Sequence, residues 1–274
     1  MKKAILPLLS AALTLPGFSS CLKSNGDIHP KSDTYVLVHG AWQAPYVWNT
    51  VRTNLENKGN QVIVVELPGH GKDNTPTYTL SIDAYRDKVI EAIAATNGKV
   101  ILVGHSMAGM VITSVAEKVP HKISKLVYIG AFLPVSGQSL AELAMSDPGS
   151  KLGNSLVESA DRLTLDVKSD SLSYLFINDG SQSDKELVAA NYRAEPAIPF
   201  TNKITLTNEN FGSVEKVYIK TLQDLVISPA LQDRMIASAR ITSVYTVSTS
   251  HSPFLAQPNA ISQLLLELSV KSKK

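Results

Sequence analysis

Cysteine is almost absent from the sequence, since Cys21 is the only one in 274 residues. A single cysteine excludes an internal disulfide, so disulfides cannot stabilise this fold even in an oxidising compartment. Long apolar runs are also missing after the first twenty residues, which excludes a multi-span membrane protein. The hydrophobic content of 44% still suffices for a sizeable core. The chain length fits one large domain better than two compact ones.

An excess of charge of either sign is missing as well. The first twenty residues contain Lys2, Lys3 and no acidic residue, and without these two lysines the chain has 24 basic residues against 24 acidic ones. Nucleic-acid binding requires a basic patch on one face, so we expect no nucleic-acid partner. Three further lysines lie in residues 268–274, which we interpret as a solvated tail.

The first twenty residues are typical of an export signal. Lys2 and Lys3 precede residues 4–18, a mostly apolar run without charge. The alternative is a buried first helix, which Pro7 and Pro16 disfavour because proline interrupts helices. We therefore predict an exported protein whose signal peptide covers residues 1–20.

Cys21 directly follows this signal, in the sequence Phe18-Ser19-Ser20-Cys21. The segment resembles the lipobox of bacterial lipoproteins, in which the cysteine is lipidated and becomes the mature N-terminus, although Phe18 stands where leucine is usual. The resemblance implies a lipoprotein of the bacterial periplasm or cell envelope, anchored to the membrane through Cys21. Cleavage by the ordinary signal peptidase, giving a periplasmic or secreted protein, is the alternative. We interpret the polar residues 21–33 as a tether.

From residue 34 onward, short apolar runs alternate with segments of helical spacing. The runs predict strands at 35–38, 62–65, 100–103, 126–129, 217–219 and 241–247, and the spacing predicts helices at 47–58, 82–96, 107–119, 230–237 and 259–270. Strands that are apolar throughout and alternate with helices indicate an α/β fold, with a mostly parallel sheet covered on both faces. In such sheets the functional loops follow the carboxyl ends of the strands. Residues 133–212 do not show this alternation.

The third predicted strand leads directly into the hexapeptide GHSMAG at 104–109. A serine on a tight strand-to-helix turn needs small residues two positions away on either side, because the backbone folds back on itself. Gly104 and Ala108 meet this need, although glycine is commoner at the second place. The motif alone is weak, and an ordinary Gly/Ser turn is the alternative. The strand before it and the helix after it favour Ser106 as a nucleophile, above a helix N-terminus that can stabilise negative charge.

A serine nucleophile requires a base, and histidine can serve when an acceptor orients it. His251 lies in the loop after the last predicted strand, at the sheet edge that also carries Ser106. Each of the other five histidines has a simpler interpretation: His29 lies in the tether, His39 shapes its loop through a hydrogen bond, His70 is structural, His105 points away from the serine and His121 lies at the surface. We therefore predict His251 as the base.

The acid that orients this histidine should lie in another loop at the same edge. Asp224 follows the strand at 217–219, and the chain order Ser106, Asp224, His251 is one of the known orders of such triads. Asp233 is the competitor, but it falls in a predicted helix. The weaker candidates fall in the irregular segment: Asp147, Asp161, Asp166 and Asp179.

Acyl transfer also requires donors for a developing oxyanion. One is the backbone N–H of Met107, directly after the serine. The second is expected from the loop after the first strand, and we choose the Ala41 N–H because Gly40 permits a tight backbone path. A plain strand-ending turn is the alternative for this loop.

Four segments around these loops carry a family resemblance. They are VLVHGAW at 36–42 with Trp48, VILVGHSMAG at 100–109, KVYIKTLQD at 216–224 and SHSPFLAQP at 250–258. Through them the chain resembles the branch of the α/β-hydrolase fold family that holds plant methylesterases, hydroxynitrile lyases and bacterial pyrethroid-type carboxylesterases. The resemblance implies an α/β-hydrolase domain over 34–274. Its sheet would have about six strands with helices on both faces, and a helical lid would be inserted at about 133–215.

The same resemblance implies Ser106, Asp224 and His251 as a catalytic triad, with the Ala41 and Met107 amides as the oxyanion hole. It implies no metal and no organic cofactor. We expect the substrate pocket to be lined by apolar side chains, although packing under the lid is an equal alternative for each: Trp42, Phe132, Leu133, Leu140, Leu143, Met145 and Phe176.

Two departures narrow the expected function. The lyases carry lysine directly after the catalytic histidine, where this chain has Ser252, and threonine where it has Gly40. In the lyases these lysine and threonine side chains bind cyanide and the cyanohydrin hydroxyl. Because this chain lacks both side chains, we expect a carboxylesterase-type serine hydrolase acting on a small-molecule ester. A carbon–carbon lyase of the hydroxynitrile type and a non-catalytic binding protein on the same fold are the alternatives.

Overall fold

A parallel sheet of six strands forms the centre of the computed structural model, which describes residue 1 and residues 32–271. The strands are, in spatial order, β2 (Gln61–Val65), β1 (Thr34–Val38), β3 (Val100–His105), β4 (Ile123–Ile129), β8 (Lys216–Thr221) and β9 (Ser243–Val247). Every neighbouring pair is parallel, so the predicted fold class is confirmed. The predicted signal beyond Met1, Cys21 and the tether up to residue 31 lie outside the described residues.

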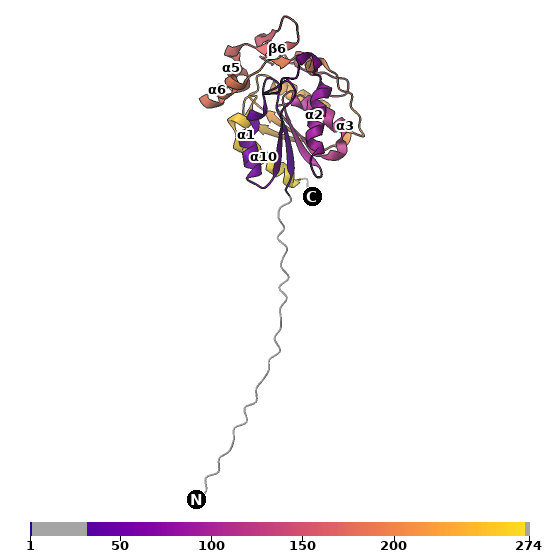
Figure 1. Ribbon diagram of the computed structural model, residues 1–274, viewed down its shortest axis with the longest axis vertical. Helices are drawn as coiled ribbons and strands as arrows, with labels where there is room; N and C mark the ends of the chain where they lie inside the picture. Colours follow the sequence, from indigo (N-terminus) through magenta and orange to yellow (C-terminus); the bar gives the residue numbers. More distant parts are fainter. Residues whose placement is uncertain (2–31, 272–274) are drawn as a thin grey trace. The chain divides into compact units, whose positions relative to one another are not determined.

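The inner strands are buried on both faces, as their apolar runs predict. Tyr35 and Leu37 of β1 point to one face, and Val36 and Val38 point to the other, because side chains alternate along a strand. The first face is covered by α1 (Asn49–Glu56) and α10 (Pro258–Lys271), and the second by α2 (Ile82–Ala94), α3 (Ala108–Lys118) and α8 (Pro229–Ser238). Figure 1 shows α1 and α10 on one side of the strands and α2 and α3 on the other.

The helices begin close to the positions that the sequence predicts. The Ser81 hydroxyl accepts a hydrogen bond from the Ala84 N–H at 3.1 Å and so caps the start of α2. The buried side chains of α2 recur at helical spacing: Ile82, Tyr85, Val89 and Ile93. None of the helices in the described part of the chain is both long and apolar enough to span a bilayer.

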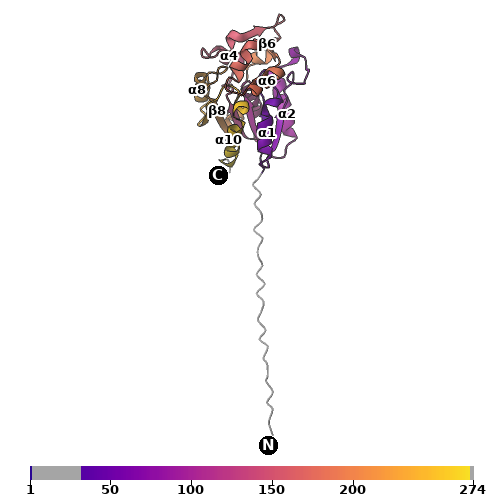
Figure 2. The same ribbon diagram turned by 90° about the vertical axis from the view of Figure 1, so that its left-hand side faces the viewer.

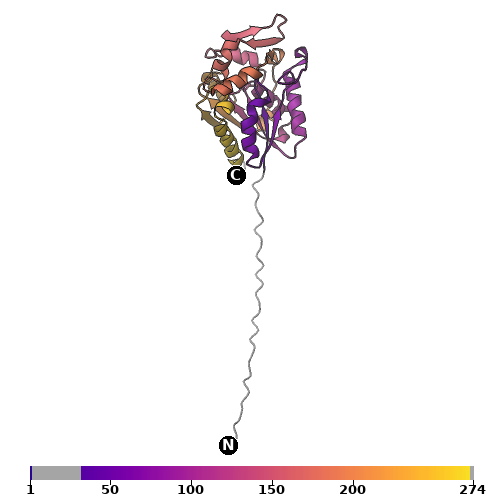
Figure 3. The same ribbon diagram turned by 60° about the vertical axis from the view of Figure 1, so that its left-hand side comes forward.

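Residues 133–215 form an insertion between β4 and β8, which we call the lid. Its elements are α4 (Leu140–Met145), α5 (Leu172–Phe176), α6 (Gln182–Asn191) and α7 (Ile198–Thr201), with an antiparallel sheet of β5 (Leu156–Glu158), β6 (Thr164–Val167) and β7 (Glu195–Pro196). The lid is therefore not purely helical, contrary to the prediction. The sequence did not reveal its strands because segments of two to four residues are too short to show an alternating pattern. Figures 1 and 2 show β6 and α6 together at one end of the sheet, and Figure 3 shows that end from a third side.

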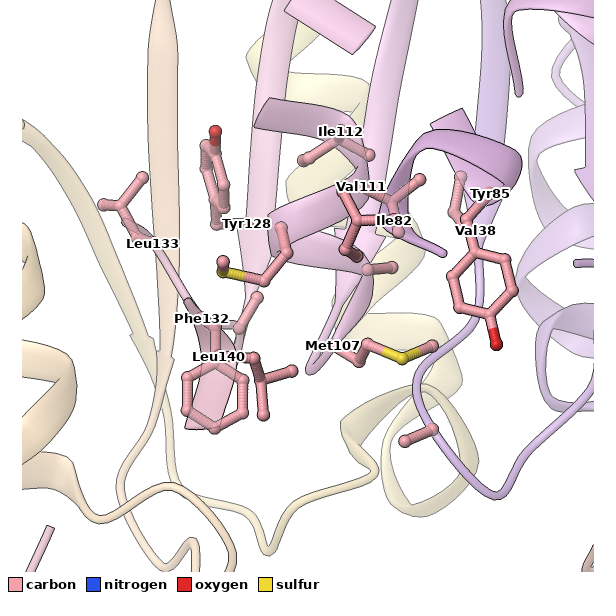
Figure 4. Packing of buried hydrophobic residues seen from close by; sticks show 14 of the residues in the cluster. Val38, Ile82, Tyr85, Met107, Val111, Ile112, Tyr128, Phe132, Leu133 and Leu140 are labelled. Atoms are coloured by element: carbon pink, nitrogen blue, oxygen red, sulfur yellow. The ribbon is translucent and has the colours of Figure 1, made fainter. Parts of the chain in front are cut away.

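The start of α3 packs directly against the segment that follows β4. A Cβ atom at Gly109, in the first turn of α3, would lie 1.9 Å from the carbonyl oxygen of Phe132. The Phe132 N–H in turn donates to the carbonyl oxygen of Ser106 at 3.1 Å. Figure 4 shows Phe132, Leu140 and Met107 among the buried residues on this side of the sheet. The serine turn is thus joined through backbone contacts to Phe132, which directly precedes the lid.

This contact predicts that Gly109→Ala destabilises the protein. The added methyl group meets a backbone oxygen that cannot move without shifting the Phe132 segment, so we expect a loss of about 1–3 kcal/mol in the free energy of unfolding, measured in urea. Gly153→Ala is the matched control, because a Cβ atom at Gly153 meets no atom within 4 Å, and its effect should stay within about 0.5 kcal/mol. Equal stability of the two variants would contradict the close packing.

Candidate active site

Ser106 lies on the turn between β3 and α3. Its φ is +55°, in the left-handed region, which costs a non-glycine residue about 1–3 kcal/mol and persists only where the surroundings enforce it. The crowding that enforces it is visible at Gly104, where a Cβ atom would lie 2.8 Å from the Ala108 carbonyl oxygen. Only glycine therefore permits the chain to cross itself at this point. The result is a serine presented at the carboxyl end of a central strand.

Ser106, His251 and Asp224 form one continuous line of hydrogen bonds. The Ser106 hydroxyl lies 3.0 Å from Nε2 of His251, and Nδ1 of His251 lies 2.8 Å from Oδ2 of Asp224. Asp224 follows β8, and His251 lies between β9 and the short helix α9 (Pro253–Ala256). All three side chains are buried. The fold thus brings together the three residues that the sequence singled out.

The Asp224 carboxylate is held in place by donors on both oxygens. Oδ2 accepts from the Thr221 hydroxyl at 2.7 Å, and Oδ1 accepts from the N–H groups of Val226 and Ile227 at 2.8 Å and 2.9 Å. A carboxylate fixed in this way accepts a hydrogen bond from Nδ1–H of His251 and so selects one tautomer of the ring. Nε2 is then left as a proton acceptor that faces the Ser106 hydroxyl.

The other acidic candidates have different partners. Asp233 is exposed on α8 and forms an ion pair with Lys220. The remaining four accept hydrogen bonds from side chains or backbone groups of the lid and its neighbouring loops: Asp147, Asp161, Asp166 and Asp179. Within the described residues, no three histidine, cysteine, aspartate or glutamate side chains group as ligands for a metal ion.

His39 shapes the loop after β1. Its Nδ1 lies 2.9 Å from the Gly40 carbonyl oxygen, and its Nε2 accepts from the Leu67 N–H at 3.3 Å. Burial, reinforced by the nearby His70, lowers the pKa of His39 to about 3, so the ring is neutral and Nδ1–H is the donor. This bond fixes the peptide plane between Gly40 and Ala41. Because the C=O and N–H of a trans peptide point in opposite directions, the Ala41 N–H points away from His39.

The N–H groups of Ala41 and Met107 are available to a ligand. Both residues are buried, and both line the cavity that contains Ser106. Within residues 32–271, neither N–H donates a hydrogen bond to another group of the chain. Two such donors beside a serine hydroxyl are what the oxyanion of a tetrahedral acyl intermediate requires.

His105 supports His251 rather than Ser106. Its Nε2 donates to the His251 carbonyl oxygen at 2.8 Å, and the two rings lie 4.6 Å apart between centroids. Burial lowers the pKa of His105 well below its usual value, so the ring is neutral. His105 therefore holds the backbone of the histidine loop. The sequence placed this ring away from the serine but gave no sign of which group it would meet.

A cavity of about 280 Å³ opens at Ser106 beneath the lid. Four of the expected pocket residues line it: Trp42, Phe132, Leu140 and Met145. Phe176 packs instead against the rings of Trp42 and His251, at centroid distances of 5.7 Å and 5.8 Å. Most of the other lining side chains are apolar and were missed, because they come from short or irregular segments without periodicity: Ala141, Ala144, Leu152, Leu156, Leu165, Phe200 and Val226.

Leu133 and Leu143 lie elsewhere, contrary to expectation. Both line a separate hollow against α8. The Leu133 N–H contacts the Met235 sulfur of α8 at 3.3 Å. Leu143 lies on the side of α4 that is turned away from Ala141 and Met145, which face the cavity. Their apolar character reflects packing under the lid, the alternative that the sequence left open.

The comparisons with known proteins point to one family. Residues 35–264 match a family model described as "Alpha/beta hydrolase family". The chain is 31% identical over 251 residues to an Arabidopsis thaliana protein named "Putative methylesterase 13, chloroplastic", a match that covers 86% of this chain and 56% of that protein. The chain thus spans little more than half the length of that relative.

Solved structures show the same fold. The crystal structure of polyneuridine aldehyde esterase superimposes with a TM-score of 0.79 at 23% identity, covering 87% of this chain and 100% of that one. A pyrethroid hydrolase from Sphingobium faniae JZ-2 gives a TM-score of 0.78 at 21% identity, covering 86% of this chain and 97% of that one. These likenesses confirm the predicted fold.

The geometry predicts that Asp224 activates Ser106 through His251. A fluorophosphonate probe should label Ser106, and Asp224→Asn should slow this labelling by about 10⁴-fold, because an amide no longer enforces the required tautomer of His251. Asp233→Asn, on the exposed side of α8, is the matched control and should react at the wild-type rate. Mass spectrometry of the intact protein follows the reaction. Similar rates for the two variants would rule out Asp224 as the orienting acid.

Proposed function

The chain belongs to the alpha/beta hydrolase family, and on this premise we propose that it is a carboxylesterase-type serine hydrolase that forms an acyl-enzyme on Ser106. The observation that carries the proposal is the hydrogen-bonded line from Asp224 through His251 to Ser106, beside the N–H groups of Ala41 and Met107. The methylesterase name of the Arabidopsis relative supports an ester as the substrate.

The proposed reaction begins with attack of Ser106 Oγ on the ester carbonyl carbon. His251 Nε2 accepts the hydroxyl proton, and Asp224 stabilises the imidazolium through Nδ1–H. The N–H groups of Ala41 and Met107 bind the oxyanion, which collapses to an acyl-enzyme as His251 returns the proton to the departing alcohol. Water then attacks the acyl-enzyme while His251 accepts its proton, and the acid is released as His251 returns that proton to Ser106 Oγ.

The cavity supports a small to medium, neutral ester as substrate. Its lining is mostly apolar, and a volume of about 280 Å³ excludes bulky substrates unless the lid moves. Asp147 lies in the wall, but both of its carboxylate oxygens accept hydrogen bonds from Ser228. That carboxylate is therefore engaged within the protein and offers little to a cationic substrate.

Two features favour hydrolysis over cyanohydrin cleavage. Ser252, at the place where the resembling lyases carry lysine, is fully buried and accepts a hydrogen bond from Gln43 at 3.0 Å. At Gly40, where those lyases carry threonine, a Cβ atom would lie 2.7 Å from Nδ1 of His105 and 2.8 Å from Cβ of Ser106.

Cyanide release from mandelonitrile above background would favour the lyase instead. Failure of a fluorophosphonate to label Ser106 would favour a binding protein.

The proposal predicts that Ser106→Ala abolishes ester turnover. Without a nucleophile the rate of p-nitrophenyl acetate or butyrate hydrolysis by purified protein should fall by about 10⁴-fold or more. Ser183→Ala, an exposed serine of α6, is the control and should retain the wild-type rate. Turnover near the wild-type rate in Ser106→Ala would refute the assignment.

We further propose that the protein is exported and anchored through a lipidated Cys21. The basic start, the uncharged apolar run and the position of the single cysteine support this proposal. Cys21→Ser should move the protein from the membrane fraction to the soluble fraction of a bacterial host, because a protein without the lipid has lost its anchor. Unchanged partitioning of the variant would point to a soluble periplasmic or secreted protein.

A further inference from the structure

Glu195 is a fully buried carboxylate of the lid that no step of the proposed reaction uses. It lies on β7, and its Oε2 accepts two hydrogen bonds from outside the lid. One comes from the backbone N–H of Trp42 at 2.8 Å, and the other from Nε2 of His70 at 2.8 Å. Glu195 therefore links the lid to the loop after β2 and to the loop that contains Ala41.

His70 completes a buried ion pair with Glu195. Its Nδ1 lies 3.0 Å from the Pro68 carbonyl oxygen while Nε2 faces the carboxylate, so both ring nitrogens carry protons. Burial lowers the pKa of His70, but the charge and hydrogen bond of Glu195 outweigh it and the pKa is raised overall. A buried ion pair is weak evidence for stabilisation, because desolvation offsets most of the attraction. The pair instead lies where it can hold the loop that contains Ala41.

Trp42 is held almost entirely by the lid. Its φ is +61°, a left-handed conformation that a non-glycine residue keeps only where its surroundings enforce it. Besides the bond from its N–H to Glu195, its indole N–H donates to the Leu165 carbonyl oxygen at 2.9 Å. Its own carbonyl oxygen accepts from the Arg193 N–H at 3.4 Å. The lid thus fixes the backbone of Trp42 on both sides.

The two peptide planes that flank Ala41 are therefore fixed from opposite directions. His39 binds the Gly40 carbonyl oxygen, which belongs to the same peptide as the Ala41 N–H, and Glu195 binds the N–H of the next peptide. A change of φ at Trp42 would rotate the peptide between Ala41 and Trp42, and with it the Ala41 N–H, relative to the chain that follows. The direction of the Ala41 N–H thus depends on a lid residue as well as on its own loop.

We propose that Glu195 is a positioning residue for the oxyanion hole, which is complete only while the lid holds Trp42. The inference rests on the proposed function, because it assigns to Glu195 the orientation of the Ala41 N–H towards the oxyanion. It makes the lid a part of the catalytic arrangement in addition to a cover for the substrate.

The test compares Glu195→Met with Glu195→Gln in the full-length protein, using p-nitrophenyl butyrate. Met has a similar length but no acceptor for the Trp42 N–H, so kcat per titrated active site should fall by about 10- to 100-fold. KM should change by less than about threefold, because the oxyanion forms only in the transition state. Gln retains an oxygen at the same place and should bring kcat back to within about fivefold of the wild type.

Two controls separate this role from a general effect on folding. Glu195→Met combined with His70→Leu replaces the ion pair by apolar side chains, leaves no unpaired charge and should fold, yet should show the same loss of kcat. Val188→Ala, which opens a cavity under α6 of the lid, should leave kcat per active site unchanged. Affinity for a trifluoromethyl ketone, whose adduct with Ser106 carries an oxyanion, should fall in parallel with kcat.

The outcomes are distinguishable from a failure of the proposed function. Losses confined to KM or to the fraction of titratable sites, with kcat per site and ketone affinity unchanged, would overturn the role of Glu195. A wild type that labels with a fluorophosphonate but hydrolyses no ester would overturn the proposed function alone. In that case the role of Glu195 is judged by the labelling rate of Ser106, which should fall in Glu195→Met and recover in Glu195→Gln.

Discussion

The left-handed turn at Ser106 is the constraint on which the rest of the site depends. A strand ends and a helix begins around one residue whose φ is +55°, and the crossing leaves no room for a side chain at Gly104 or Gly109. The same turn binds the Phe132 segment through the Ser106 carbonyl oxygen. The strand β3, the helix α3 and the segment that leads into the lid are therefore fixed together. This matters because a displacement of about 1 Å at a reacting atom can cost about 10²-fold in rate.

Around this turn, each reacting group of the proposed mechanism is oriented by a neighbour that does not itself react. The Thr221 hydroxyl and two backbone N–H groups hold Asp224, and His105 holds the backbone of His251. His39 fixes one peptide beside Ala41, and Glu195 of the lid is proposed to fix the next. Residues outside the lid thus orient most of the reacting groups, and the proposed contribution of Glu195 comes from the lid, which also covers the cavity. Groups held in this way cost no reorganisation when charge develops in the transition state.

The elements that long patterns describe were predictable from the sequence, and those set by short segments were not. Six apolar runs gave the sheet, and the rule that loops at carboxyl strand ends carry function placed Ser106, Asp224 and His251 at one edge. The lid strands escaped prediction because they have no period to detect. Leu143 was misplaced because only the packing of α4 decides which of its sides meets the cavity. Glu195 gave no signal, since its role depends on contacts with residues more than a hundred positions away in the chain.

The central claim is that Ser106 carries a covalent acyl group during turnover. Rapid acid quenching of the wild-type protein with p-nitrophenyl butyrate, followed by peptide mass spectrometry, tests it directly. The account predicts the mass of one butyryl group on Ser106 in the peptide that contains it, and no such addition in the corresponding peptide of Ser106→Ala. Release of nitrophenolate with the butyryl group on a different residue, or without any acylated peptide, would contradict it.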